Sequence, residues 1–262
     1  MNLETKPDWM ATLPRNVVQT LRGDADGPLL LVCEHAARFI PEGLASLGLE
    51  AAEAQSHIAW DPGALRVAEH LSALQNSALI SQKISRLVYD CNRPPESPQA
   101  IRADSEIYHI PGNADLGEAE RTARVTHIYQ PFRQALARHL DQHAPRALVT
   151  IHSFTPVYNG KPRAVEIGIL HDSDPRMADA MLEAARQNPS YMVGRNQPYG
   201  PEDGVTHTLT EHALPRGMLN VMIEIRNDLI ATPESQQAVA VWLSDILTLS
   251  LDSIPLEAKC PE

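Results

Sequence analysis

Short apolar runs alternate with longer segments of helical periodicity, and this alternation constrains the fold of the chain more than any other feature of its sequence. The predicted strands are Leu29–Cys33, Ser77–Ser81, Leu87–Tyr89, Ala147–Ile151, Val165–Leu170 and Met218–Ile225. The predicted helices are Pro62–Gln75, Glu118–Gln142, Pro175–Gln187 and Thr232–Leu251. Such an order is typical of a mixed or parallel sheet that helices cover on both faces. We therefore predict an α/β fold.

Two long segments interrupt this alternation. Asn92–Asn113 is rich in proline, and Arg195–Pro215 is rich in glycine, proline and polar residues. Long connections without periodicity are often functional loops, so we expect both to lie over an active site. A chain of 262 residues can bury one large core, and the prediction is a single domain over residues 1–262.

The composition restricts the partners of the protein. The 33 acidic and 22 basic residues give a net charge of -11, which argues against a surface for nucleic acid or anionic membrane. No apolar run reaches the ~20 residues of a membrane span, and the N-terminus lacks a signal-peptide pattern. The cysteines Cys33, Cys91 and Cys260 are far apart, which favours reduced thiols. These features predict a cytoplasmic protein, and none of them indicates an oligomeric state.

Histidines follow two of the predicted strands. His152 comes directly after Ala147–Ile151, and His35 follows Leu29–Cys33 after one residue. Open α/β folds bind ligands at the carboxyl ends of their strands, and two histidines with one carboxylate make an open zinc site. Asp61 is the nearest suitable carboxylate after His35, and Glu34 is the alternative ligand. Each histidine could instead be a hydrogen-bonded structural residue.

The string Ser85–Pro94 carries two arginines and an amide. A strand at this place would set Arg86 and Asp90 on one face and direct Asn92 and Arg93 toward the loop. Guanidinium groups match carboxylates in a bidentate fork, so these residues could hold a small dianionic substrate. The alternative for Arg86 is a structural ion pair with Asp90.

Glu224 falls late in an otherwise apolar strand, where a carboxylate is costly unless it has a partner or a function. Next to a zinc-bound water it could act as general base and return the proton to the leaving amine. The alternative is an ion pair with Arg226, which lies on the same face of the strand. His207 and His212 could donate to a substrate carbonyl or face solvent.

Several motifs together resemble the N-formylglutamate amidohydrolase family. They are Cys-Glu-His-Ala at Cys33–Ala36, Trp-Asp at Trp60–Asp61, Ser-Arg-Leu-Val-Tyr-Asp-Cys-Asn-Arg-Pro at Ser85–Pro94, Ile-His-Ser-Phe at Ile151–Phe154 and Ile-Glu-Ile-Arg-Asn at Ile223–Asn227. The resemblance covers about residues 29–251 in the expected order. It places the chain in a divergent branch, because Glu34 precedes His35 where the family's deformylases carry a different residue.

The resemblance implies a phosphorylase/hydrolase-like three-layer sandwich related to the zinc carboxypeptidases. It implies a Zn²⁺ cofactor on His35, Asp61 and His152, with Glu224 as the catalytic residue. The implied reaction is hydrolysis of the amide bond of an N-formyl or N-acyl amino acid similar to N-formyl-L-glutamate. Alternatives are a related zinc hydrolase for a short peptide or a cell-wall amide, or a non-catalytic binding protein. The residues expected to bind the small anionic substrate are Arg86, Asn92, Arg93, Ser153, His207 and Arg226.

Overall fold

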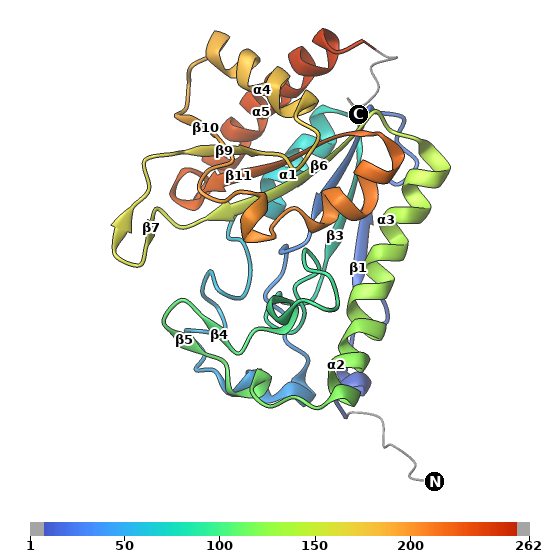
Figure 1. Cartoon of the computed structure of the whole chain (residues 1–262), viewed down its shortest axis with the longest axis vertical. Helices are drawn as coiled ribbons and strands as arrows, with labels where there is room; N and C mark the ends of the chain where they lie inside the picture. The colour runs from blue at the N-terminus through green and yellow to red at the C-terminus, as the bar shows by residue number, and fades with distance from the viewer. Residues whose placement is uncertain (1–7, 256–262) are drawn as a thin grey trace.

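The computed structural model describes residues 8–255 and is built around a sheet of seven strands in the order β1-β3-β2-β6-β11-β9-β10 (Figure 1). β3, β2, β6 and β11 run parallel to one another, whereas β1 runs antiparallel to β3 and β9 runs antiparallel to β11. The strands are β1 (Val18–Leu21), β2 (Leu29–Cys33), β3 (Ala78–Gln82), β6 (Ala147–Phe154), β9 (Ile167–Leu170), β10 (Val193–Arg195) and β11 (Leu219–Arg226). Two hairpins, β4–β5 (Asp104–Ser105 and Tyr108–His109) and β7–β8 (Val157–Tyr158 and Lys161–Pro162), stand apart from this sheet.

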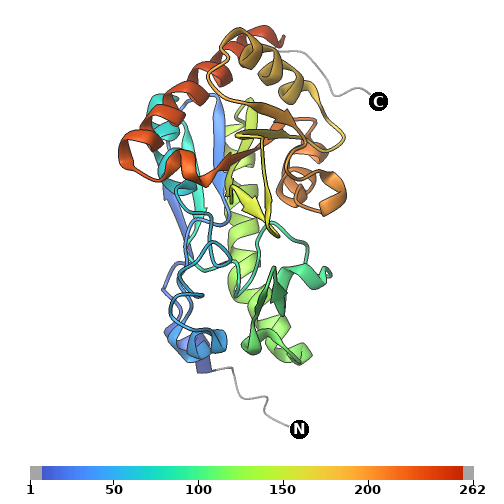
Figure 2. The same cartoon turned by 90° about the vertical axis from the view of Figure 1, so that its left-hand side faces the viewer.

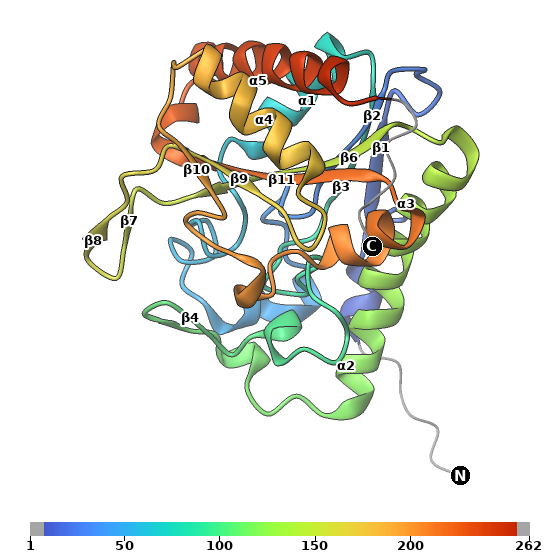
Figure 3. The same cartoon turned by 45° about the horizontal axis from the view of Figure 1, so that its top comes forward.

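Helices cover both faces of the sheet, which confirms the predicted three-layer α/β fold (Figures 1 and 3). On one face lie α1 (Ala64–Leu74), α4 (Arg176–Gln187) and α5 (Pro233–Ser253). On the other face lies α3 (Gln130–His143), which continues α2 (Glu118–Arg124) through a π-helical turn at Val125–Tyr129. In the described part of the chain no helix has both the length and the apolar character needed to cross a membrane.

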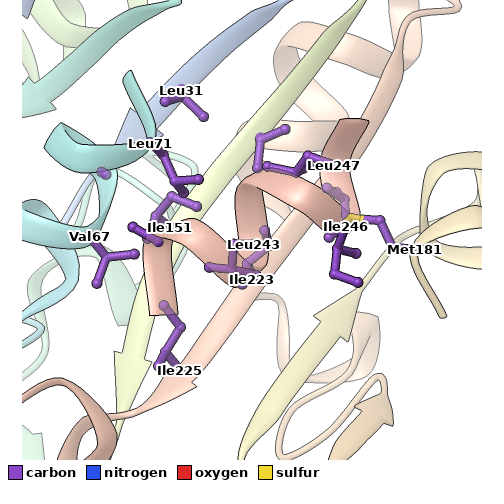
Figure 4. Packing of buried hydrophobic residues seen from close by; sticks show 14 of the residues in the cluster. Leu31, Val67, Leu71, Ile151, Met181, Ile223, Ile225, Leu243, Ile246 and Leu247 are labelled. Carbon is purple, nitrogen blue, oxygen red and sulfur yellow. The ribbon is translucent and has the colours of Figure 1, made fainter. Parts of the chain in front are cut away.

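Two buried apolar layers hold these elements together. The period of two in a strand sends alternate residues to opposite faces, so Ile151 packs under α1 and α5 while Leu148 faces α3. Figure 4 shows the first layer, in which Leu243 and Leu247 of α5 lie against Ile223 of β11 and Ile151 of β6. Because β6 and β11 are buried along nearly their whole length, a polar residue in either strand is held in a rigid, water-poor setting.

The structure corrects the sequence-based elements in a few places. Leu87–Tyr89 is a helical turn rather than a strand, with the amide of Val88 donating to the carbonyl of Ser85 over 2.9 Å. β6 continues through His152 and ends at Phe154, and the edge strands β1 and β10 were not predicted. Cys33 and Cys91 are buried free thiols, as expected, whereas Cys260 lies outside the described residues.

Candidate metal centre and active site

Three side chains from separate segments converge at the carboxyl end of the sheet. His152 comes from β6, His35 from the turn after β2, and Asp61 from the turn before α1. The Nδ1 atoms of the two histidines are 3.2 Å apart, and Asp61 Oδ2 lies 3.2 Å from His35 Nδ1 and 3.0 Å from His152 Nδ1. All three residues are buried. The predicted triad therefore forms one cluster.

Backbone contacts set the position of Asp61. Its amide donates to the carbonyl of His35 over 3.0 Å, which ties the two loops together. Gly63 then adopts a φ of +83°, and a Cβ there would lie 2.6 Å from the carbonyl oxygen of Ile230. Only glycine accepts this conformation without strain, so the sharp turn that presents Asp61 depends on it.

The outer nitrogen of each histidine faces a second carboxylate. His35 Nε2 lies 2.7 Å from Asp90 Oδ1, and His152 Nε2 lies 3.0 Å from Glu34 Oε2. The contact with Glu34 has the distance of an ion pair but not the angles of a hydrogen bond. A carboxylate at the outer nitrogen holds the proton there and leaves the Nδ1 lone pair free, as in histidine ligands of metal ions.

The donor set fits a zinc ion. Zinc–nitrogen and zinc–oxygen distances of about 2.0–2.2 Å imply about 3.3–3.6 Å between neighbouring ligands of a tetrahedron. The distances of 3.0–3.2 Å within the triad are close to this value. Without a cation, two imidazole lone pairs and a carboxylate would face one another in a buried space, which is unfavourable. Among the described residues 8–255, the group of histidine, cysteine and acidic side chains close enough together to hold a metal ion is this triad.

The surrounding charges fit the same interpretation. Burial acts to lower the pKa of His152, but the carboxylates of Glu34 and Asp61 outweigh it and raise the pKa well above its usual value. Burial acts to raise the pKa of Asp61, but His35, His152 and Arg86 outweigh it and lower the pKa. The triad therefore favours positive charge at its centre, which either a proton or a metal ion can supply.

Glu224 lies beside this cluster. It occupies β11 in register with His152 on the neighbouring parallel strand β6, and it lines the same cavity. Its side chain is 4% exposed, and Oε2 has no hydrogen-bond partner in the described structure. Burial raises the pKa of Glu224 to about 7. A buried carboxylate with a free oxygen and a pKa near neutrality is suited to take up and release a proton.

A cavity of about 310 Å³ opens over the triad. The loop Asn92–Asn113 contributes Arg93 and Arg102, and the loop Arg195–Pro215 contributes Tyr199 and Asp203, so both predicted loops border the site. Arg93 is buried, its Nη1 donates to the carbonyl of Asp203 over 2.9 Å, and its Nε has no partner. Its guanidinium therefore keeps unused hydrogen-bonding capacity next to the cavity.

Arg86 is compatible with both roles that the sequence left open, an ion pair with Asp90 and a contact with the substrate. Its Nη2 donates to Asp90 over 2.9 Å and its Nη1 donates to Asp61 over 3.3 Å, and it also lines the cavity. The helical turn keeps Arg86 and Asp90 on one side, as the predicted strand would have done. The ion pair with Asp90 is thus present, although the local structure is different.

Asn92 and Ser153 line the cavity while their polar groups hold neighbouring backbone. Asn92 accepts from the amide of Thr208 over 3.0 Å and donates to the carbonyl of Val205 over 2.5 Å. Ser153 donates its hydroxyl proton to the carbonyl of Pro62, and its amide donates to Asp61 Oδ2 over 3.2 Å. Both residues therefore position the site as well as border it.

His207, His212 and Arg226 are not among the residues that line this cavity, and substrate contacts by His207 and Arg226 stay predictions. His207 Nε2 lies 2.8 Å from the hydroxyl of Tyr129, in the layer under α3. Arg226 does not pair with Glu224: it donates to Asp228 over 2.8 Å and to Glu166 over 3.4 Å. The strand ends at Arg226, and a 3₁₀ turn that carries Asp228 begins at the next residue.

Sequence reasoning missed several residues of the site. Arg102 donates to Asp90 over 3.4 Å, and burial, with Arg86 and Arg93 nearby, lowers the pKa of Arg102 to about 10. Tyr199 and the pair His57–Glu106, whose side chains meet over 2.9 Å, also border the cavity. Arg102, Glu106 and Tyr199 lie in the two long loops, and only that position could have indicated them, whereas His57 lies in the irregular segment before α1.

Comparison with known proteins gives consistent results. A sequence model of the N-formylglutamate amidohydrolase family matches residues 27–231. The crystal structure of gene product Atu2144 from Agrobacterium tumefaciens is 55% identical with a TM-score of 0.88, over 91% of this chain and 96% of that one. The N-formylglutamate amidohydrolase from Ralstonia eutropha JMP134 shares the fold with 18% identity and a TM-score of 0.59, over 90% of this chain and 96% of that one. None of the curated proteins matches the sequence.

Proposed function

Because the chain belongs to the N-formylglutamate amidohydrolase family, we propose that it hydrolyses the amide bond of a small N-acyl amino acid with a free carboxylate, using a zinc ion on His35, Asp61 and His152. Water and the amide would give a carboxylic acid and a free amino acid. The observation that carries this proposal is the convergence of the Nδ1 atoms of both histidines and Asp61 Oδ2 within 3.2 Å of one another. A bound zinc ion would supply a Lewis acid that polarises a carbonyl and lowers the pKa of water.

Glu224 is the proposed general base. It would take a proton from the attacking water and deliver it to the nitrogen of the leaving amine, so that the proton count balances. Its free Oε2 in the wall of the cavity and its raised pKa support this role. Glu34 is a weaker candidate, because it lies behind His152 and does not line the cavity.

Asp90 and Glu34 are proposed to orient the two histidines. Each carboxylate holds the outer nitrogen of one ring, which would keep both Nδ1 lone pairs directed at the metal. Asp90 also accepts from Arg86 and Arg102. This arrangement supports Asp61, rather than Glu34, as the proposed carboxylate ligand.

Arg93 and Arg102 are proposed to bind the carboxylate of the substrate. Arg86 already donates to both Asp61 and Asp90, whereas Arg93 keeps an unpartnered Nε and Arg102 makes one long contact. A cavity of about 310 Å³ is at the lower end of the range for small-molecule sites. This size favours an amino-acid derivative over a longer peptide or a cell-wall fragment.

The test combines metal analysis with an amine-release assay. The purified protein should contain about one zinc ion per chain and release free amino acid from at least one N-acyl amino acid. His152→Ala should lose both zinc and activity, while Arg66→Ala, on the exposed side of α1, should retain both. A fully active protein without bound metal would contradict the proposal.

A further inference from the structure

One wall of the cavity is aromatic, although most of the residues that line the cavity are polar. Phe154, Tyr158 and Tyr199 border the cavity together. The chain contains only three phenylalanines and six tyrosines, so this concentration of aromatic rings is unusual for the sequence. Phe154 lies at the end of β6 and Tyr158 in the β7–β8 hairpin that follows it, whereas Tyr199 comes from the loop after β10.

Arg163 holds the three rings in place. Its guanidinium carbon lies 4.6 Å from the centre of the Tyr158 ring, 4.8 Å from that of Tyr199 and 5.4 Å from that of Phe154. Its Nη2 also donates to the hydroxyl of Tyr199 over 2.9 Å. Arg163 is not among the residues that line the cavity, so it supports the aromatic wall from behind.

The three rings line the cavity to different extents, since Phe154 is 3% exposed and Tyr158 is 36% exposed. The hydroxyl of Tyr199 is already paired with Arg163, and Phe154 has no polar group. The β7–β8 hairpin that carries Tyr158 projects from the sheet toward the part of the molecule that contains β4 and β5 (Figure 2). Arg93 and Arg102 come from that other part, in the loop Asn92–Asn113, so the charged and aromatic walls belong to different segments.

We propose that the aromatic wall of Phe154, Tyr158 and Tyr199 is an acyl-binding site that selects N-acyl amino acids with an apolar acyl group of several carbons over N-formyl compounds. This inference rests on the proposed function. If Arg93 and Arg102 bind the carboxylate of the amino acid, the acyl group is the part left to contact the rings. A formyl group carries only a hydrogen on its carbonyl carbon and would leave this surface uncovered.

The test is a series of substrates that differ only in the acyl group. The zinc-loaded protein is assayed by amine release on N-formyl-, N-acetyl-, N-butanoyl- and N-hexanoyl-L-glutamate. Burial of apolar surface should raise kcat/KM by about fourfold for each methylene that the wall covers, mainly through KM. Equal or faster hydrolysis of the formyl compound overturns the inference while the proposed function stands. Absence of hydrolysis across this series, and across the same acyl groups on other amino acids, by protein with full zinc content overturns the proposed function, and the inference with it.

Variants of the β7–β8 hairpin and of Arg163 test whether the aromatic wall determines the selectivity for the acyl group. Tyr158→Ala should reduce the butanoyl-to-formyl ratio of kcat/KM by at least about fivefold, because it removes one ring of the wall. Val157→Ala is the matched control, since Val157 is a neighbouring exposed residue of β7 that does not line the cavity. Arg163→Ala should lower the same ratio, and Arg163→Lys should restore part of it by keeping a cation against the rings. An unchanged ratio in Tyr158→Ala overturns the inference.

Discussion

Replacement of Glu224 by glutamine should make the metal-free protein more stable at neutral pH while it removes catalysis. Glu224 is 4% exposed, and no group donates to its Oε2 in the described structure. Burial raises its pKa from an ordinary value of 4.5 to about 7. The difference between these values corresponds to about 3 kcal/mol of free energy, which the folded protein loses when Glu224 ionises.

The sign of the effect follows from proton binding. Between pH 4.5 and pH 7 the folded state holds a proton on Glu224 that the unfolded state has released. The free energy of unfolding therefore falls as the pH rises through this range, and the loss is complete above about pH 7. Glutamine does not ionise, so the stability advantage of Glu224→Gln should grow with pH and approach about 3 kcal/mol at pH 8.

The assay is urea unfolding of chelator-treated wild-type and variant protein at pH 5, 6, 7 and 8. Glu42→Gln serves as the control, because Glu42 is exposed and should not reproduce this pH dependence. With zinc restored, Glu224→Gln should keep its metal and lose about 10²–10⁴-fold in kcat, since the amide cannot accept the proton. A stability difference that does not change with pH, or near-normal turnover, would refute the reasoning.

Three further predictions concern the metal and the substrate. His152→Ala should abolish stoichiometric zinc in elemental analysis, whereas Glu34→Gln should weaken zinc binding by only about 10–100-fold, and the reverse order would make Glu34 a ligand. Arg93→Ala should raise KM for a substrate with a free carboxylate by about tenfold or more and hardly change KM for its neutral amide analogue, while Arg66→Ala changes neither; equal losses on both substrates would make Arg93 structural. Zinc affinity should fall as the pH is lowered, because Glu34 and Asp61 raise the pKa of His152 and a proton then competes with the metal; a pH-independent affinity in competition titrations would argue against His152 as a ligand.

The sequence by itself determined the central elements of the fold and indicated the histidines of the candidate metal centre, while it left the carboxylate open between Asp61 and Glu34. Buried strands such as Ala147–Ile151 are continuous apolar runs, and helices such as α5 have an apolar stripe, so their signals are local and can be read without a structure. His35 and His152 were identified because each follows such a run. Glu224 was identified because a carboxylate is conspicuous in a run of apolar residues.

Only the tertiary structure decided how the loops complete the site. Arg102 and Tyr199 reach the cavity from loops without periodicity, and their positions depend on contacts with residues distant in the sequence, such as Asp90 and Arg163. The ion-pair partner of Arg226 was also undetermined, because Glu166 lies 60 residues away in the sequence. Loop paths and ion-pair partners follow from the packing of the whole chain, so local patterns indicated the candidate metal ligands and Arg93, but not Arg102 or Tyr199.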